Sequence, residues 1–227
     1  MKTIISVIML LLMTSWSYAN DIYVTQSGAS LDLDITQDGE NNTVGNSTTA
    51  STSTGATTIL NIDQIGNSNV ITYQINGATY TGVINLVGSS NNVDLNCDST
   101  GGNSSCGSAN AVINFTGSSN DIDLDIGQTS SASSADVDIV GQTGSDSNVV
   151  AATVDGNSAI LTITINGDTN NYLIDIDGNG DVNGHTLIHS HTGGIADVDI
   201  IQSGTNDNMI TLTTSGDNAD IDISQTD

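Results

Sequence analysis

Basic residues are almost absent from this sequence. Lys2 is the only lysine or arginine in 227 residues, against 26 acidic residues and three histidines, and the formal net charge is −25. The acidic side chains have no lysine or arginine partner after residue 19, so the chain must either stay spread out in solvent or hold its carboxylates apart on a surface with solution cations between them. Nucleic acids and anionic lipids are bound by basic side chains, so we expect neither as a partner.

Proline is absent as well, and aromatic residues make up only 3% of the chain. Without proline, no position interrupts the backbone hydrogen bonds of a β-sheet. The apolar run at residues 4–13 is too short to span a bilayer permanently, and no second run of this kind follows it. We therefore expect no membrane insertion.

The N-terminus has the features of a secretory signal peptide. Lys2 precedes the apolar run, and Ser17 and Ala19 place small residues at the first and third positions of a signal-peptidase site. We predict that residues 1–19 are a signal peptide, that the mature chain starts at Asn20, and that the protein is secreted to the extracellular space or cell surface. A buried N-terminal helix is the disfavoured alternative, because the rest of the sequence has strand character.

Only two cysteines occur, Cys97 and Cys106, and the residues between them are small or polar turn-formers. An even number of cysteines in an exported chain predicts a disulfide, here one that closes a small loop. A metal-binding or redox pair is the disfavoured alternative, because the spacing is not Cys-x-x-Cys and no cationic neighbour lowers a thiol pKa.

Glycines recur about every eleven residues, for example at Gly66, Gly77 and Gly88. Apolar and polar residues alternate between them, as at residues 31–35 and 161–165, which is typical of strands with one inward face. A strand and a turn in each interval give a unit of about 22 residues. We predict an all-β domain over residues 20–227, a β-solenoid with two strands per coil and about eight coils that can stack end to end.

Three intervals between glycines are too long for this unit. They contain a Ser/Thr-rich stretch, the cysteine pair and a second serine-rich stretch, so we predict insertions at solenoid corners near residues 46–58, 97–106 and 129–135. The first stretch has an alternative interpretation as a linker, with strands in 22–44 forming a small separate cap.

Four turns share a glutamine, a glycine two residues later and an asparagine three or four residues after that. Several other turns keep Gly-x-x-Asn without the glutamine. Glycine permits a positive φ at a reversal, asparagine tolerates the left-handed region, and an inward amide repeated on each coil can form a ladder. The motif residues are Gln37, Gly39 and Asn42; Gln64, Gly66 and Asn69; Gln142, Gly144 and Asn148; and Gln202, Gly204 and Asn208.

At these residues the chain resembles the curlin repeat of bacterial curli, whose unit is roughly Ser-x5-Gln-x-Gly-x-x-Asn followed by a second strand. Ile35, Ile62 and Ile200 each stand two residues before the glutamine, where that family also has a β-branched residue. The resemblance implies an extracellular functional amyloid, whose subunits stack end to end into the cross-β fibres of a biofilm matrix.

The two ends of the sequence after residue 19 support self-assembly independently. Residues 22–26 and 221–225 both read as strands, and no helical or polar cap accompanies either. A bare first coil and a bare last coil are complementary head to tail, which predicts an open homopolymeric filament.

Two other functions stay open. One is a monomeric, calcium-dependent adhesin or surface-binding solenoid whose ends are blunted by charge. The other is an ice- or polysaccharide-binding solenoid that uses rows of threonine, such as Thr211 and Thr213.

Pairs of aspartates separated by one residue recur along the strands, as at Asp32 and Asp34 or Asp220 and Asp222. Each flanks an inward aliphatic residue, so the aspartates face outward. Carboxylates stacked about 4.8 Å apart repel unless cations lie between them. We predict that Ca²⁺ or other divalent or sea-salt cations screen this face and favour assembly. A solvated acidic coat that keeps fibres soluble explains the pattern equally well.

One segment resembles the start of an EF-hand calcium loop, with oxygen ligands at Asp175, Asp177, Asn179, Asp181 and Asn183. Position twelve of that loop is Thr186 instead of a bidentate glutamate, so an ordinary turn is the favoured interpretation. No cofactor is required by the sequence, and Ca²⁺ is the one candidate.

Three histidines, His185, His189 and His191, share parity and so face the same way on one strand. Two imidazoles at this spacing can bind zinc or copper, but we favour titrating surface or corner residues.

Sequence motifs of catalysis are missing. No Gly-x-Ser-x-Gly elbow, His-Glu-x-x-His or P-loop occurs. Paired aspartates serve glycoside hydrolysis, but abundant aspartate produces such pairs by composition alone. We predict that the protein is not an enzyme.

Overall fold

The computed structural model describes residues 20–46, 48–97, 106–127, 134–156, 158–177, 185–204 and 208–226. Within these ranges the chain consists of β-strands joined by turns, and no helix is present that could span a membrane. The predicted signal peptide, residues 1–19, lies outside the described residues. The prediction of an all-β solenoid with two strands per coil is confirmed.

Seventeen strands follow one another within the described residues, and most have alternating buried and exposed residues. They are β1 (Asn20–Ile22), β2 (Thr25–Ser27), β3 (Ser30–Asp38), β4 (Asn42–Val44), β5 (Ser51–Ile65), β6 (Ser68–Val87), β7 (Ser90–Cys97), β8 (Ser108–Thr116), β9 (Ser119–Ile126), β10 (Ser134–Gly141), β11 (Asn148–Asp155), β12 (Ala159–Asn166), β13 (Asn170–Asp177), β14 (Thr186–Thr192), β15 (Ala196–Ser203), β16 (Met209–Ser215) and β17 (Ala219–Thr226).

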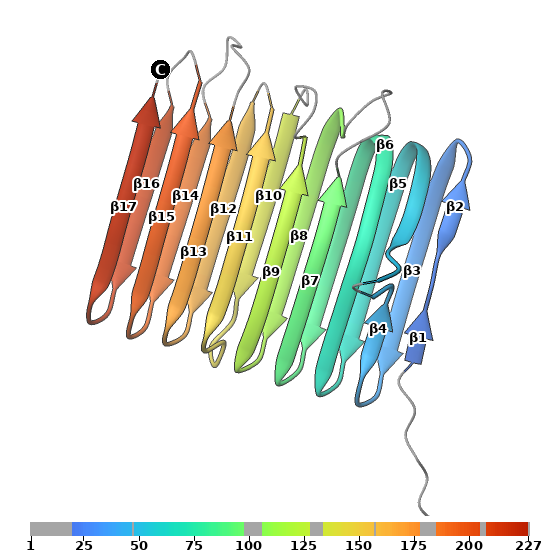
Figure 1. The fold of residues 1–227 in the computed structure, drawn as a ribbon, viewed down its shortest axis with the longest axis horizontal. Helices are drawn as coiled ribbons and strands as arrows, with labels where there is room; N and C mark the ends of the chain where they lie inside the picture. Colours follow the sequence, from blue (N-terminus) through green and yellow to red (C-terminus); the bar gives the residue numbers. More distant parts are fainter. Residues whose placement is uncertain are drawn as a thin grey trace, which may run out of the picture.

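The strands form two layers of parallel strands that pack face to face (Figure 1). Sheet I contains β1, β2, β4, β7, β9, β11, β13, β15 and β17, and sheet II contains β3, β8, β10, β12, β14 and β16. The long strands β5 and β6 bend at Gly55 and Gly77 and contribute one half to each sheet. Each coil therefore crosses sheet I, turns, and returns in sheet II.

Inward side chains of successive coils lie in vertical rows between the two sheets. Ile122, Val150, Tyr172 and Val198 form one such row, and each is fully buried. Burying one large aliphatic side chain stabilises the fold by about 1.5–3 kcal/mol. Because every described coil between the end coils contributes to these rows, the stack shares one continuous apolar core.

Glycine is required at the corners because the coils approach closely there. A Cβ atom on Gly66 would lie 2.3 Å from the carbonyl oxygen of Gly39, and one on Gly117 would lie 2.0 Å from that of Gly88. We expected positive φ at the motif glycines, but Gly144 is the one among the four that has it. Of the other three, Gly66 leaves space for the backbone of the preceding coil, whereas a Cβ atom on Gly39 or Gly204 would meet the side chain of Asn20 or His185.

The predicted insertions are only partly loops. Residues 51–58 belong to β5, so the loop prediction for that part of 46–58 is wrong, and the departure from the coil is confined to the turn around Asn46 and Thr49. The linker alternative is also wrong, because β3 pairs with β5 over its whole length. The predicted insertions near 97–106 and 129–135 fall mostly on residues outside the described ranges, although 134 and 135 belong to β10.

Candidate assembly surfaces and interior ladders

A ladder of asparagines runs through six successive coils of sheet I. Each Nδ2 donates to the Oδ1 of the next asparagine at 2.5–3.3 Å, and each side chain is at most 3% exposed. The ladder consists of Asn42, Asn69, Asn91, Asn120, Asn148 and Asn170. Because the second amide proton often reaches a turn carbonyl, such as that of Gly117 or Gly167, the ladder also fixes the turns.

The ladder stops before the last two coils, where Ala196 and Ala219 occupy the same row. At the other end, the Oδ1 of Asn42 is buried without a hydrogen-bond partner. Donors point toward the C-terminal end throughout, so the ladder has a direction.

Glutamines form two short ladders in different sheets. In sheet II, Gln64 Nε2 donates to Gln37 Oε1 at 2.6 Å. In sheet I, Gln225 Nε2 donates to Gln202 Oε1 at 3.3 Å. The predicted turn glutamines therefore do not share one row, and Gln142 is exposed on a turn, so the prediction of a ladder through it is wrong. Gly141 occupies the inward position there, against Phe115 and Ile165.

The remaining motif residues lie at turns between sheets. Gly39 and Gly66 stack on each other, whereas a Cβ atom on Gly144 would meet no other atom within 4 Å. Gly204 lies against the ring of His185. Asn208 Oδ1 accepts from the backbone N–H of His185 at 3.1 Å, while its Nδ2 is buried without a partner.

The two end coils lie at opposite ends of the stack, and nothing described covers either (Figure 1). Ile221 and Ile223 point inward, yet they are 37% and 48% exposed because β17 has no strand beyond it. At the other end, Ile22 and Leu33 are only partly buried. Both ends thus present apolar side chains and strand edges with unpaired backbone groups.

The outer face carries the aspartates, as predicted, but few of them stack directly on one another. Asp34 accepts a hydrogen bond from Asn61 at 2.8 Å and Asp63 accepts one from Asn85 at 2.5 Å, so each of these carboxylates stacks on a neutral amide. Aspartates paired in register on neighbouring strands include Asp94 with Asp123, Asp197 with Asp220, and Asp199 with Asp222.

Crowding changes the acidity of the first of these pairs. Burial raises the pKa of Asp94, and repulsion from Asp125 raises it further. Burial also raises the pKa of Asp123, followed by repulsion from Asp125, Asp94 and Asp121.

The three histidines lie in the interior, so the expectation of surface residues is wrong. His185, His189 and His191 are each at most 3% exposed. The His189 ring meets Tyr172 edge to face, 4.4 Å between centroids, and Tyr172 Oη lies 3.0 Å from His191 Nδ1. Both ring nitrogens of His189 lack a partner. Burial lowers the pKa of His189 to about 4, with repulsion from His191 as a second cause, and burial lowers the pKa of His191 against the pull of Asp168.

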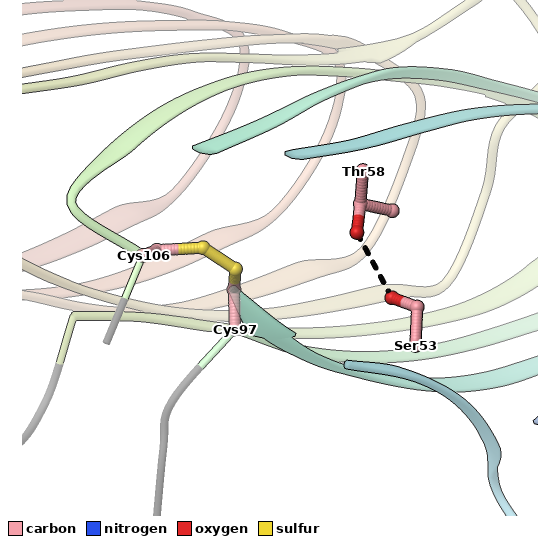
Figure 2. Close-up of a disulfide and its surroundings, with 4 residues drawn as sticks. All are labelled: Ser53, Thr58, Cys97 and Cys106. Carbon is pink, nitrogen blue, oxygen red and sulfur yellow. Dashed lines mark hydrogen bonds between the residues drawn. A yellow bond between two sulfur atoms is a disulfide. The ribbon is translucent and has the colours of Figure 1, made fainter. Parts of the chain in front are cut away.

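The structure joins Cys97 and Cys106 in a disulfide at the sheet corner (Figure 2), with the Cα atoms 5.6 Å apart and both residues fully buried. Two coils away in the same view, Ser53 Oγ and Thr58 Oγ1 lie 3.1 Å apart across the bend of β5. A covalent link and a hydroxyl pair thus close the same edge of the stack at different coils.

The candidate calcium loop lies mainly beyond the described residues. Asp175 and Asp177 belong to β13, whereas Asn179, Asp181 and Asn183 fall outside the described ranges. Among the residues that are described, no group of three or more His, Cys, Asp or Glu side chains is placed to hold a metal ion.

The threonine rows also fail to form, because Thr211 and Thr213 stack on Ile188 and Ser190.

Comparison with known proteins finds no matching family model, no matching curated protein and no matching solved structure. The resemblance to the curlin repeat therefore stays a prediction that depends on the turn motif.

Proposed function

We propose that this protein is a secreted structural subunit that stacks end to end into an acidic extracellular fibre. The observation that carries the proposal is the pair of open end coils. Each leaves inward aliphatic residues exposed and strand edges unpaired, and a second copy of the chain offers the matching edge. Solenoids that stay monomeric normally carry polar caps at such ends.

The stacking mechanism adds backbone hydrogen bonds and buries the end residues at the same time. Ile221 and Ile223 would gain the cover that Val198 and Ile200 already receive from β17. Cations between outward carboxylates would lower the repulsion of joining two chains of this charge.

An inward charge at one end tests the proposal. Ile223→Asp places a carboxylate on the inward row of the end coil, where a stacked copy would bury it. The control Ile201→Asp adds the same charge on the outward face of β15, at a side chain that is 46% exposed against 48% for Ile223. We expect residues 20–227 and the control to form filaments that lengthen with time and seed fresh protein, and Ile223→Asp to stay monomeric.

Equal filament formation by both variants would exclude this end as the contact. If the chain with its natural residues also stays monomeric and forms no filaments, the calcium-dependent adhesin would be favoured instead.

A further inference from the structure

The first and last coils are copies of one repeat. Residues 20–37 and 208–225 align at a constant offset of 188 (208 minus 20). The identical pairs are Asn20 and Asn208, Ile22 and Ile210, Thr25 and Thr213, Ser27 and Ser215, Gly28 and Gly216, Asp32 and Asp220, Asp34 and Asp222, Ile35 and Ile223, and Gln37 and Gln225. In both coils the glutamine Nε2 donates to the backbone oxygen of the asparagine 17 residues earlier.

These equivalent coils lie in opposite sheets. The glutamine strand is β3 in sheet II at one end and β17 in sheet I at the other. The asparagine strand is β1–β2 in sheet I and β16 in sheet II. The repeat therefore has shifted by half a coil between the two ends of the described solenoid.

The number of strand levels agrees with this shift. Among the described strands, sheet I has nine levels: β1–β2, β4–β5, β6, β7, β9, β11, β13, β15 and β17. Sheet II has eight levels: β3, β5, β6, β8, β10, β12, β14 and β16. A second copy added by translation alone would pair β1 with β17 and leave one empty level in sheet II.

A half-turn about the stacking axis removes the empty level. It brings β3 of the second copy beside β17 and β1–β2 beside β16, and it keeps the strands parallel because the two sheets run in opposite directions (Figure 1). Inward residues then meet their own equivalents: Leu33 and Ile35 cover Ile221 and Ile223.

The hydrogen-bond polarity agrees as well. Gln225 donates both to Gln202 and to the Asn208 oxygen, so Gln37 of the second copy can donate to Gln225 while keeping its bond to Asn20. This would join the two glutamine pairs into one ladder of four with a single direction.

Asn208 provides a separate observation. Its Oδ1 accepts a hydrogen bond from the backbone N–H of His185 in the preceding coil, and its Nδ2 is buried without a partner. The asparagine ladder of sheet I runs with Nδ2 directed to the next coil. Asn20 of a half-turned copy takes that next position and offers an Oδ1 acceptor to the orphaned donor.

We infer that successive subunits of the fibre are related by a half-turn about the fibre axis, with β17 paired in register to β3 and β16 to β1–β2 of the next copy. This inference depends on the end-to-end stacking proposed above. Each subunit then advances by eight and a half levels, the mean of nine and eight, or about 41 Å at a strand spacing of about 4.8 Å.

Helical reconstruction of filaments from residues 20–227 tests the inference by electron microscopy. We expect a rise of about 41 Å per subunit with a rotation close to half a turn. Filaments whose subunits are related by translation, with a level missing in one sheet, would overturn the inference and leave the proposed function standing. Absence of filaments would overturn both.

Engineered cysteines give a second readout. Asp34→Cys with Asp222→Cys places two outward thiols on neighbouring strands under a half-turn, within the Cα separation that a disulfide spans. The control Tyr23→Cys with Asp222→Cys is the pair that translation would bring together, since Tyr23 continues the outward row of Asp222 in sheet I. We expect mild oxidation of filaments to yield covalent polymers linked 34–222 and none linked 23–222, as identified by peptide mapping. A 23–222 link, or no 34–222 link in filaments that form, contradicts the inference.

Discussion

Asn91 Nδ2 lies 2.6 Å from Oδ1 of Asn120, a residue 29 positions later in the sequence, and both side chains are 2% exposed. The contact is one step of a ladder in which each amide after Asn42 is both a donor and an acceptor. Because these polar groups are enclosed by an apolar core, losing one member leaves its neighbours without partners, and that loss costs more than the single bond.

Removing one ladder member should therefore destabilise the whole stack. Asn91→Ala deletes bonds to Asn69, Asn120 and the Thr116 carbonyl, and we expect the free energy of unfolding to fall by about 2–4 kcal/mol. Asn92→Ala is the matched control, because Asn92 is exposed and its one side-chain contact, to Asp121, is 3.4 Å long. In urea unfolding, the control should lose at most about 0.5 kcal/mol of the free energy of unfolding. Equal losses in the two variants would contradict the ladder's role.

A methyl group at a stacked corner should be poorly tolerated. In Gly117→Ala the new Cβ would lie 2.0 Å from the Gly88 carbonyl oxygen, so the backbone of two coils must separate. We expect a loss of about 1–3 kcal/mol or more in stability, since strain cannot be relieved by a side chain alone. Ser118→Ala, an exposed position in the same turn, is the control. A Gly117→Ala protein with an unchanged thermal midpoint would contradict the close packing of the corner.

Acid should weaken the coil that contains the buried histidines. His189 has a pKa lowered to about 4 in the folded state, so its stabilising contribution is complete above the unfolded value of about 6.5 and is lost as the pH falls from there toward 4. At pH 5 the loss is about 2 kcal/mol relative to pH 7. His189→Phe keeps a ring against Tyr172 but cannot titrate.

The measurement is the urea midpoint of both proteins at pH 7 and pH 5. We expect the natural chain to lose more stability than His189→Phe over this interval. An equal loss in the two proteins would show that His189 does not contribute to the pH dependence.

The crowded carboxylates should act in the opposite direction. Asp123 has a raised pKa, from burial first and then from Asp125, Asp94 and Asp121, so its contribution favours folding at low pH and is lost as the pH rises through the folded pKa. Asp123→Asn should raise the thermal midpoint at pH 7 and have little effect at pH 3. Asp136→Asn is the control, because Asp136 stacks on Asn110 and Ile160 and not on a carboxylate. A stabilisation that persists unchanged at pH 3 would exclude charge as its cause.

Divalent cations should accelerate assembly more than they stabilise the single subunit. Asp220 and Asp222 already stack on Asp197 and Asp199, and an added copy lengthens these outward carboxylate rows at the joint. We expect millimolar CaCl₂ to shorten the lag before filaments form in low-salt buffer, measured by light scattering and electron microscopy. Unchanged kinetics and unchanged thermal stability would instead favour a solvated acidic coat.

The period of the sequence predicted the fold because it reports geometry directly. Alternating residues such as Leu161, Ile163 and Ile165 face inward on a strand, and one glycine turn per strand sets the coil length. The Gly-x-x-Asn spacing likewise placed Asn69, and with it the asparagine row, at equivalent points of successive coils. These predictions needed only local spacing.

Other features depend on which coils lie side by side, and local spacing does not contain that information. Gln142 carries the same motif as Gln64 but lies on an exposed turn, because the inward position falls to Gly141 beside Phe115. His189 has a polar side chain, but it occupies an inward position in the alternation of its strand. Only its contact with the facing Tyr172 shows that the interior accommodates the ring. The half-coil shift between the two ends is visible only once the strand pairs are known.

Fibre diffraction on the chain from residue 20 to 227, refolded from denaturant and incubated with and without calcium, tests end-to-end stacking most directly. The account predicts filaments whose strands lie across the fibre axis, with a meridional reflection at about 4.7–4.8 Å. A soluble, β-rich monomer that stays stable in both conditions would contradict it.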